Sequence, residues 1–163
     1  MTLRRVNDNE YVEEHGGDYE DFERGMTIRH WPGRTITETD NTWLTLLTMN
    51  QHPLHFDRHY GEHAEYGQVL VNSGITLCLV GGMTVQALSA RAVANLGWDK
   101  VRLKEPVYVG DTLYATSRVL DKRLSRSRHG HGIITVETIG TKSTGETVIV
   151  FERSYMVRCR AAA

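Results

Sequence analysis

The sequence contains little cysteine and almost no net charge. Only two of its 163 residues are cysteines, Cys78 and Cys159, and they stand far apart. Two scattered thiols provide neither a disulfide framework nor a metal-binding motif, so we expect the protein to work in the reducing cytoplasm. The formal net charge of -1 excludes an overall basic field for nucleic acid or anionic lipid, and an anionic ligand would need a local cluster of cations.

Long hydrophobic runs are also missing. The N-terminal stretch MTLRRVNDNEYVEEHGG has no apolar core of signal-peptide length. The most apolar stretch, residues 69–83, is interrupted by Asn72, Ser73, Thr76 and three glycines, which makes it too short and too polar to cross a bilayer. We therefore expect no membrane association. The hydrophobic content of 40% is that of an ordinary folded domain.

The first 25 residues differ in composition from the rest. Seven carboxylates lie between Glu10 and Glu23, and aliphatic residues are few. This composition predicts an acidic N-terminal arm over residues 1–25, either a solvated tail or a mobile arm that docks through Tyr19 and Phe22. Residues 26–160 are expected to form a single domain.

Short strands and a helix are predicted at the start of that domain. Residues 26–39 alternate as in one or two strands split at Pro32-Gly33. In the following stretch, TDNTWLTLLTMNQ, the apolar residues adopt helical spacing, and Thr39 or Asp40 is a suitable N-cap. This helix should end before Pro53, because proline disfavours helical geometry in the residue before it.

The longest helical candidate is VNSGITLCLVGGMTVQALSARAV, which Asn72 or Ser73 can cap. Apolar residues surround its first half, so we expect it to be buried on all sides, with Cys78 as a small buried hydrophobe. Its Gly81-Gly82 pair costs about 1 kcal/mol of helix propensity per glycine. That cost suggests that another segment packs closely against the backbone there.

The rest of the chain has the pattern of strands separated by glycine-rich turns. The strands are predicted within residues 99–125, 130–142 and 145–160, with turns at 109–111, 129–132 and 143–145. The order of elements predicts an α+β fold in which an antiparallel sheet wraps around one long helix.

Three separated motifs carry a resemblance to a known family. They are NQHPLHFD, YGQVLVNSG at the start of the long helix, and EPVYVGDTL. These motifs resemble those of the MaoC-like dehydratases, which include the R-specific enoyl-CoA hydratases, and the resemblance covers roughly residues 25–158. The positions that fall on the family pattern are Pro53, His55, Asp57, Gly67, Pro106, Val107, Gly110, Asp111, Thr112 and Leu113.

The resemblance implies a hotdog fold and a hydro-lyase that acts on an enoyl-CoA thioester. It further implies a homodimer, no metal and no redox cofactor, with coenzyme A entering as part of the substrate. The variant DNTWLTLLTMNQHPLHFD resembles a subgroup associated with hydration of branched dicarboxyl-CoA thioesters such as mesaconyl- or itaconyl-CoA.

Hydration of an enoyl thioester needs a polarised carbonyl group, a base and an acid. We assign the carbonyl contact to the backbone N–H groups of Ser73 and Gly74, which are free donors at the positive end of a helix dipole. Ordinary capping by Asn72 or Ser73 would use the same turn, and Asn72 is also a candidate substrate contact. His55 is the candidate proton carrier, because imidazole transfers protons in either direction near neutrality.

Asn50 is the main departure from the family pattern, because the family has a catalytic aspartate there. His52 replaces the family's asparagine, and Asn72-Ser73 replaces His-Gly. An amide takes no proton at useful pH, although it can orient a water molecule. Three alternatives stay open: His55 works with Asn50 as the water holder, a carboxylate enters from elsewhere, or the chain is inactive.

Two carboxylates near His55 in the sequence are candidates for that acid. Asp40 is the nearest upstream carboxylate, although a helix N-cap is the stronger interpretation. Asp57 would share a face with His55 if the segment between them were extended.

The remaining charged candidates each have a structural alternative. His59 and His63 continue the four-residue spacing from His55 and suggest a zinc pair, but Gly61 should interrupt the helix and a solvated face is favoured. Arg126 and Arg128, on one face of a predicted strand and turn, suit the phosphates of coenzyme A or a substrate carboxylate, and would equally protect a solvated strand edge.

Two other functions remain compatible with the same motifs. A hotdog acyl-CoA thioesterase would use the same carbonyl contact. It normally requires an acidic residue near the thioester carbon, which Asn50 does not supply. A catalytically silent acyl-CoA-binding module would explain the missing aspartate.

Overall fold

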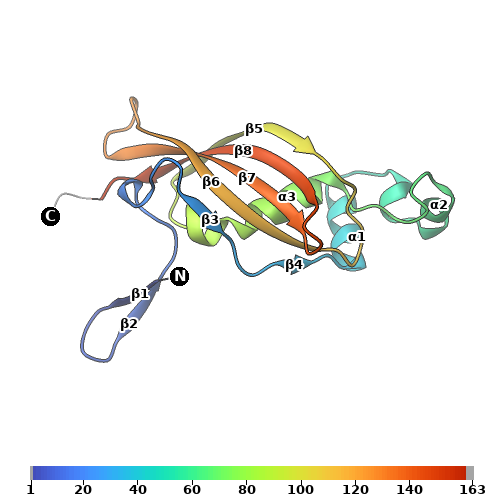
Figure 1. The fold of residues 1–163 in the computed structure, drawn as a ribbon, viewed down its shortest axis with the longest axis horizontal. Helices are drawn as coiled ribbons and strands as arrows, with labels where there is room; N and C mark the ends of the chain where they lie inside the picture. Colours follow the sequence, from blue (N-terminus) through green and yellow to red (C-terminus); the bar gives the residue numbers. More distant parts are fainter. Residues whose placement is uncertain (1, 161–163) are drawn as a thin grey trace.

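The strands predicted in the second half of the chain form one antiparallel sheet in the computed structural model, which describes residues 2–160. The long strands are β5 (Ala94–Leu103), β6 (Thr112–Leu124), β7 (His131–Lys142) and β8 (Thr147–Arg158). Two short strands, β3 (Thr27–Arg29) and β4 (Arg34–Thr35), flank the predicted Pro-Gly break. Both pair with β6, and the sheet order is β3-β6-β7-β8-β5 (Figure 1).

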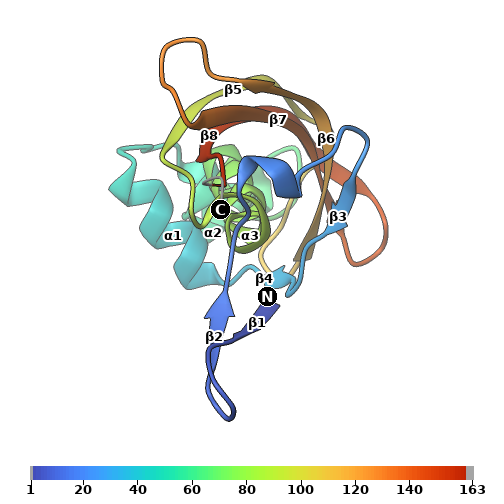
Figure 2. The same cartoon turned by 90° about the vertical axis from the view of Figure 1, so that its left-hand side faces the viewer.

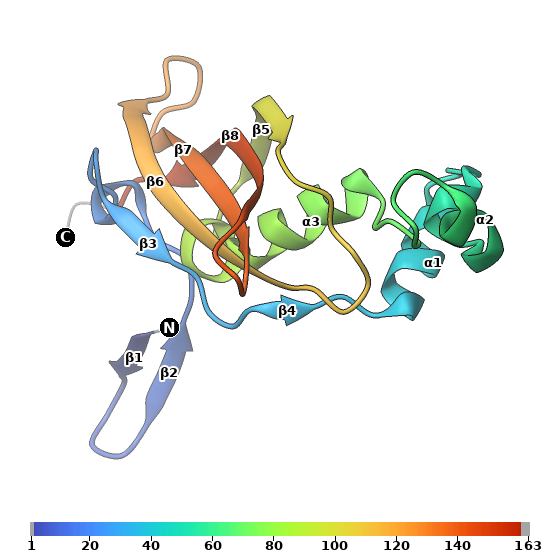
Figure 3. The same cartoon turned by 45° about the vertical axis from the view of Figure 1, so that its right-hand side comes forward.

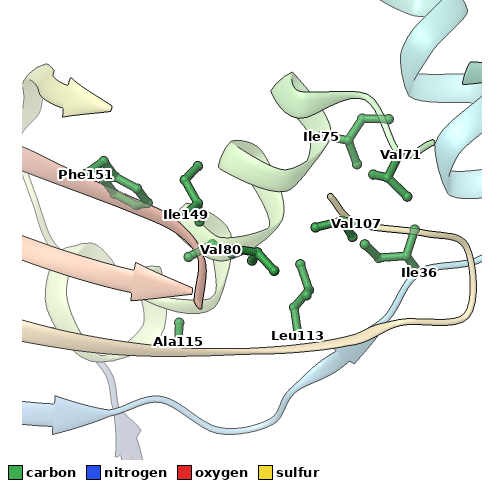
Figure 4. Packing of buried hydrophobic residues seen from close by; sticks show 10 residues of the cluster. Ile36, Val71, Ile75, Val80, Val107, Leu113, Ala115, Ile149 and Phe151 are labelled. Atoms are coloured by element: carbon green, nitrogen blue, oxygen red, sulfur yellow. The ribbon is translucent and has the colours of Figure 1, made fainter. Parts of the chain in front are cut away.

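The sheet curves around one helix, which confirms the predicted α+β layout. Helix α3 (Ser73–Met83) lies along the concave face and continues into η3 (Val85–Ser89), a turn of π-helix (Figure 2). In the larger core cluster, Val80 of α3 packs among side chains of β6 and β8, including Leu113 and Ile149 (Figure 4). Burial of this apolar surface is what holds the helix in the sheet.

Helix α3 is capped by Asn72, as predicted, but it is not buried on all sides. Asn72 Oδ1 accepts a hydrogen bond from the N–H of Gly74 at 2.8 Å. Cys78 and Gly82 are exposed, so the prediction of a buried Cys78 was wrong. The sheet covers only one side of the helix, and small residues lie on the other side. Within residues 2–160 no helix is both long and apolar enough to span a bilayer.

The predicted close approach at Gly81-Gly82 was also wrong. A Cβ atom added at either glycine would meet nothing within 4 Å. The close approach occurs instead at Gly140 of β7, where a Cβ atom would lie 2.7 Å from Cγ2 of Val80 and 2.8 Å from Cγ2 of Ile149. Helix α3 therefore contacts the sheet where the strand lacks a side chain, not where the helix does.

The N-terminal 25 residues consist of a projecting hairpin and a docked segment. Strands β1 (Thr2–Arg5) and β2 (Tyr11–Glu14) form the hairpin, and η1 (Tyr19–Asp21) follows (Figure 1). Phe22 is 2% exposed and lies edge-on to Tyr155, with ring centroids 6.2 Å apart. Lys122 Nζ donates to the carbonyl groups of Tyr19 and Phe22 at 2.9 and 2.6 Å. These contacts fasten the segment to the sheet.

Three helical segments lie beyond the end of the sheet, beside the N-terminal end of α3 (Figure 3). They are α1 (Glu38–Leu47), η2 (Pro53–His55) and α2 (Arg58–His63). Helix α1 ends well before Pro53, as predicted.

The N-cap of α1 is Thr37, and the prediction of Thr39 or Asp40 was wrong. Thr37 and Asp40 form a capping box: Thr37 Oγ1 accepts from the N–H of Asp40, and Asp40 Oδ2 accepts from the N–H of Thr37 at 2.8 Å. Arg34 Nη2 donates to the other carboxylate oxygen at 2.7 Å. The hydrogen bonds from Thr37 and the one from Arg34 lower the pKa of Asp40 to about 2.

We predict opposite effects for alanine at two glycines. Gly140→Ala should lower the free energy of unfolding by about 1–3 kcal/mol, because its Cβ would overlap Val80 and Ile149. Gly82→Ala, in open space on α3, should raise it by up to about 1 kcal/mol through helix propensity. Urea unfolding measures both, and equal effects would contradict the location of the close approach.

We predict that the stabilisation by Asp40 depends on pH. The pKa is depressed in the folded state, so the stabilisation is complete above the usual carboxyl value of 3.8 and disappears as the pH falls toward about 2. Asp40→Asn should therefore lower the free energy of unfolding at pH 7 by about 0.5–1 kcal/mol, with a difference from wild type that vanishes near pH 2. Glu65→Gln, at an exposed position, is the control and should show no such trend. A difference that stays constant between pH 7 and pH 2.5 would count against the capping box.

Candidate active site

His55 is presented by a turn that two preceding side chains shape. Asn50 Oδ1 accepts from the N–H of His52 at 3.0 Å, and His52 Nδ1 accepts from the N–H of Leu54 at 3.2 Å. Pro53 then begins η2, and His55 ends it. Asn50 and His52, the two departures from the family pattern, therefore both have a structural role in the turn that carries His55.

The imidazole of His55 is held by a backbone carbonyl group. His55 Nδ1 lies 3.1 Å from the carbonyl oxygen of Leu70. A carbonyl oxygen only accepts hydrogen bonds, so Nδ1 carries the proton and Nε2 keeps its lone pair in the neutral ring. The ring is half-buried. This arrangement leaves one nitrogen ready to accept a proton.

Asn41 is the residue near His55 that sequence reasoning missed. It lies on the buried side of α1 and is 1% exposed. Its Nδ2 donates to the carbonyl groups of His55 and Leu70 at 2.7 and 3.0 Å, and its Oδ1 accepts from the N–H of Asn72 at 3.0 Å. The apolar pattern gave no signal for it, because Trp43, Leu46 and Leu47 of α1 are exposed, while the buried residues of the helix are Asn41 and Thr45.

The start of α3 provides one free backbone donor of the two predicted. The N–H of Gly74 is engaged by the cap, since it donates to Asn72 Oδ1. In the described part of the chain, the N–H of Ser73 has no hydrogen-bond acceptor. Asn72, a candidate substrate contact, is buried, and its side-chain oxygen serves the cap. The geometry therefore favours Ser73 over Gly74 as the carbonyl contact.

Two pockets meet at His55. One, which we call the α3 pocket, has a volume of about 290 Å³ and is lined by His55, Leu70, Ser73, Lys104 and Glu105 among others. His55 and Ser73, the first residue of α3, thus line the same cavity. A thioester placed there can contact both.

The second cavity, which we call the α2 pocket, is also lined by His55. It has a volume of about 320 Å³, and its polar lining includes Glu38, Arg58, Glu62 and Gln68. Arg58 Nη2 lies 3.3 Å from Glu38 Oε1, and these side chains are 72% and 70% exposed. An ion pair this exposed is weak, so the guanidinium can exchange Glu38 for another carboxylate.

The two carboxylates proposed from the sequence both serve as helix caps. Asp40 belongs to the capping box of α1, and Asp57 Oδ1 caps α2 by accepting from the N–H of Tyr60 at 3.0 Å. The premise for pairing Asp57 with His55 was wrong, because His55 ends a 3-10 turn rather than an extended segment. Carboxylates do reach the cavities, but from Glu38, Glu62 and Glu105.

His59 and His63 lie on the exposed surface of α2. His63 Nδ1 is 2.8 Å from the carbonyl oxygen of His59. Gly61 does not interrupt the helix as predicted; it is buried within α2, where a Cβ atom would lie 2.9 Å from the nitrogen of Val69. Among residues 2–160, no group of three or more His, Cys, Asp or Glu side chains is placed to hold a metal ion.

Arg126 and Arg128 lie far from His55 within the chain. Strand β6 ends at Leu124, so both arginines belong to the exposed β6–β7 turn, and the strand alternation that predicted a shared face does not apply. This turn is at the opposite end of the sheet from α1 and α2 (Figure 1).

Comparison with known proteins identifies the family. The family model described as mesaconyl-CoA hydratase matches residues 1–163. The mesaconyl-CoA hydratase of Haloarcula marismortui is 32% identical over 163 residues, which are 99% of this chain and 46% of that protein. The chain spans about half the length of the curated hydratases it matches.

Solved structures agree on the fold. The putative MaoC domain protein dehydratase of Chloroflexus aurantiacus is 33% identical, with a TM-score of 0.84 over 91% of this chain and 42% of that one. A Mycobacterium tuberculosis protein with a double hotdog fold superposes with a TM-score of 0.83 at 22% identity, over 91% of this chain and 46% of that one. The hotdog prediction is therefore confirmed, and the chain belongs to the mesaconyl-CoA hydratase family of MaoC-like proteins.

Proposed function

We propose that the protein adds or removes water at the double bond of an enoyl-CoA thioester, and that its substrate is a branched dicarboxyl-CoA such as mesaconyl-CoA. The observation that carries this proposal is the pairing of His55, with Nε2 free, and the free N–H of Ser73 in one cavity. The names of the family and of the Haloarcula relative support the substrate class.

The chemistry follows from these two groups. The thioester oxygen accepts from the N–H of Ser73, where the helix dipole favours the negative charge that develops as water attacks Cβ. His55 Nε2 takes a proton from the water as the O–Cβ bond forms, and then returns that proton to Cα. Dehydration is the reverse. The reaction so described needs no metal and no redox cofactor, and coenzyme A enters with the substrate.

The position of the thioester suggests where the second carboxylate of the substrate lies. In mesaconyl-CoA the thioester and the free carboxylate stand at opposite ends of the double bond. If the thioester occupies the α3 pocket beside Ser73, the carboxylate points past His55 into the α2 pocket. Arg58 lines that pocket and can receive a carboxylate with its fork of donors.

We also propose that the partner is a second copy of this chain, paired along β5. In the described sheet β5 is an edge strand, and it exposes Leu96 and Trp98 at 48% and 50%. An edge with apolar side chains favours pairing with another strand. The double hotdog protein is about twice the length of this chain, which supports a partner of the same fold.

Both thiols of the protein are free, which is consistent with the reducing cytoplasm that we propose as its location.

His55→Ala tests the activity. With mesaconyl-CoA, wild type should reduce the absorbance of the conjugated thioester, and the variant should be slower by about 10²–10⁴-fold. His59→Ala, on the exposed side of α2, should match wild type. Release of free thiol by wild type would identify a thioesterase, and tight binding without turnover would identify a silent module. Full hydratase activity in His55→Ala would show that the proton carrier is another residue.

Arg58→Gln tests the substrate class. Loss of a charge-assisted contact should lower kcat/KM for mesaconyl-CoA by about 10–100-fold. Crotonyl-CoA, which has no free carboxylate, should be hydrated as before. Lys104→Gln, in the α3 pocket, is the matched control. It should leave the ratio of kcat/KM for mesaconyl-CoA to kcat/KM for crotonyl-CoA unchanged. A changed ratio in Lys104→Gln, with none in Arg58→Gln, would reverse the assignment of the two pockets.

A further inference from the structure

One buried amide contacts both halves of the candidate site. Asn41 Nδ2 donates to the carbonyl group of His55 itself and to that of Leu70, which in turn holds the His55 ring. Asn41 Oδ1 accepts from the N–H of Asn72, the residue that caps α3 and precedes Ser73. The three bonds measure 2.7, 3.0 and 3.0 Å, and the side chain is 1% exposed.

We propose that Asn41 is a positioning residue that fixes the His55 ring relative to the Ser73 N–H. The inference rests on the proposed hydration, in which a substrate must touch both groups at once. Asn41 touches neither the ring nor the Ser73 N–H and acts through Leu70 and Asn72. A single rigid amide thereby sets the distance across which the thioester has to fit.

Only asparagine satisfies this position. The site presents two acceptors, the carbonyl groups of His55 and Leu70, and one donor, the N–H of Asn72. The asparagine amide offers two N–H donors and an oxygen acceptor at matching size. Aspartate accepts from Asn72 but sets a negative charge against two carbonyl oxygens. A buried leucine would leave the His55 carbonyl group and the Asn72 N–H unpaired.

Asn41 also affects the proton chemistry through Leu70. The Leu70 oxygen accepts from both Asn41 and His55, so loss of the Asn41 bond leaves it a stronger acceptor for the Nδ1–H of His55. A stronger acceptor favours the charged ring. Aspartate at position 41 would also favour the charged His55 ring, because it adds a negative charge nearby. A purely structural residue would lower stability without moving the pH profile.

The test compares Asn41→Asp and Asn41→Ala with Thr45→Val. Thr45 lies one turn further along α1, is equally buried, and its hydroxyl has no hydrogen-bond partner in the described chain, so its loss perturbs α1 without touching the site. Hydration of mesaconyl-CoA is followed from pH 5 to pH 9, and melting temperatures are recorded in parallel.

Both Asn41 variants should lower kcat by about 10²-fold, with KM changed far less, since misplacement of reacting groups costs rate. The acid limb of kcat/KM should move to higher pH, by about one unit in Asn41→Asp and by less in Asn41→Ala. Thr45→Val should keep the wild-type profile. The titratable and charged groups around His55 stay the same in every variant: the ring of His52, 5.8 Å away, and the cavity-lining Glu38, Arg58, Glu62, Tyr66, Lys104 and Glu105.

Three results would overturn the proposal. They are an unchanged pH profile with only a lower melting temperature, the same shift in Thr45→Val, and failure of both Asn41 variants to fold, which would make Asn41 a folding determinant only. If wild type hydrates no enoyl-CoA, the proposed function fails instead. The ¹⁵N shifts of the His55 ring, assigned with His55→Gln, then decide about Asn41 alone: the neutral ring should be the Nδ1–H form in wild type, and Asn41→Ala should keep a larger fraction of charged ring at the same pH. An equal fraction of charged ring in the two proteins would overturn the proposal.

Discussion

The site depends on the packing of α3 against the concave face of the sheet. Val80 and Gly140 bring helix and strand into close contact, which fixes the helix along its length and leaves its first turn beyond the end of the sheet. There the first turn meets α1 and η2, and the Asn41 amide joins the three segments. Burial of apolar surface therefore fixes the position of the N-terminal end of α3, and a few hydrogen bonds fix its orientation toward His55.

Much of this architecture could be predicted because it is local or periodic. Alternation located β6, β7 and β8, the change of period located α1, and Asn72 before an apolar run located the start of α3. Strand β5 begins at Ala94, ahead of the predicted strands. The Pro-Leu-His stretch and the separated family motifs led to His55. Each of these signals lies within a short window of sequence, where spacing and side-chain chemistry already determine the outcome.

The features that sequence reasoning missed or misplaced depend on contacts between distant segments. The close approach at Gly140 requires Val80, sixty positions earlier in the chain, and no local pattern distinguishes Gly140 from Gly82. Cys78 looked buried because its neighbours are apolar, but the sheet covers only one side of α3. Asn41 bonds with His55, Leu70 and Asn72, up to 31 positions away. The Thr37 cap is an exception, because it was missed although it depends on a local pattern: Thr37 and Asp40 have the spacing of a capping box.

The missing aspartate has a different meaning once the turn is seen. From sequence, Asn50 removed an acid from the pattern and left inactivity open. In the structure its oxygen binds the N–H of His52, and His52 in turn binds the N–H of Leu54, so the two substituted positions build the turn that presents His55. With Nδ1 bonded to Leu70, Nε2 is the nitrogen left to accept a proton. In the proposed hydration, a base that takes a proton from water at Cβ can deliver it to the adjacent carbon without a second acid. In the proposed reaction a one-residue relay would tolerate little error in the position of that ring, and the buried amide of Asn41, which bonds to His55, Leu70 and Asn72, limits that error.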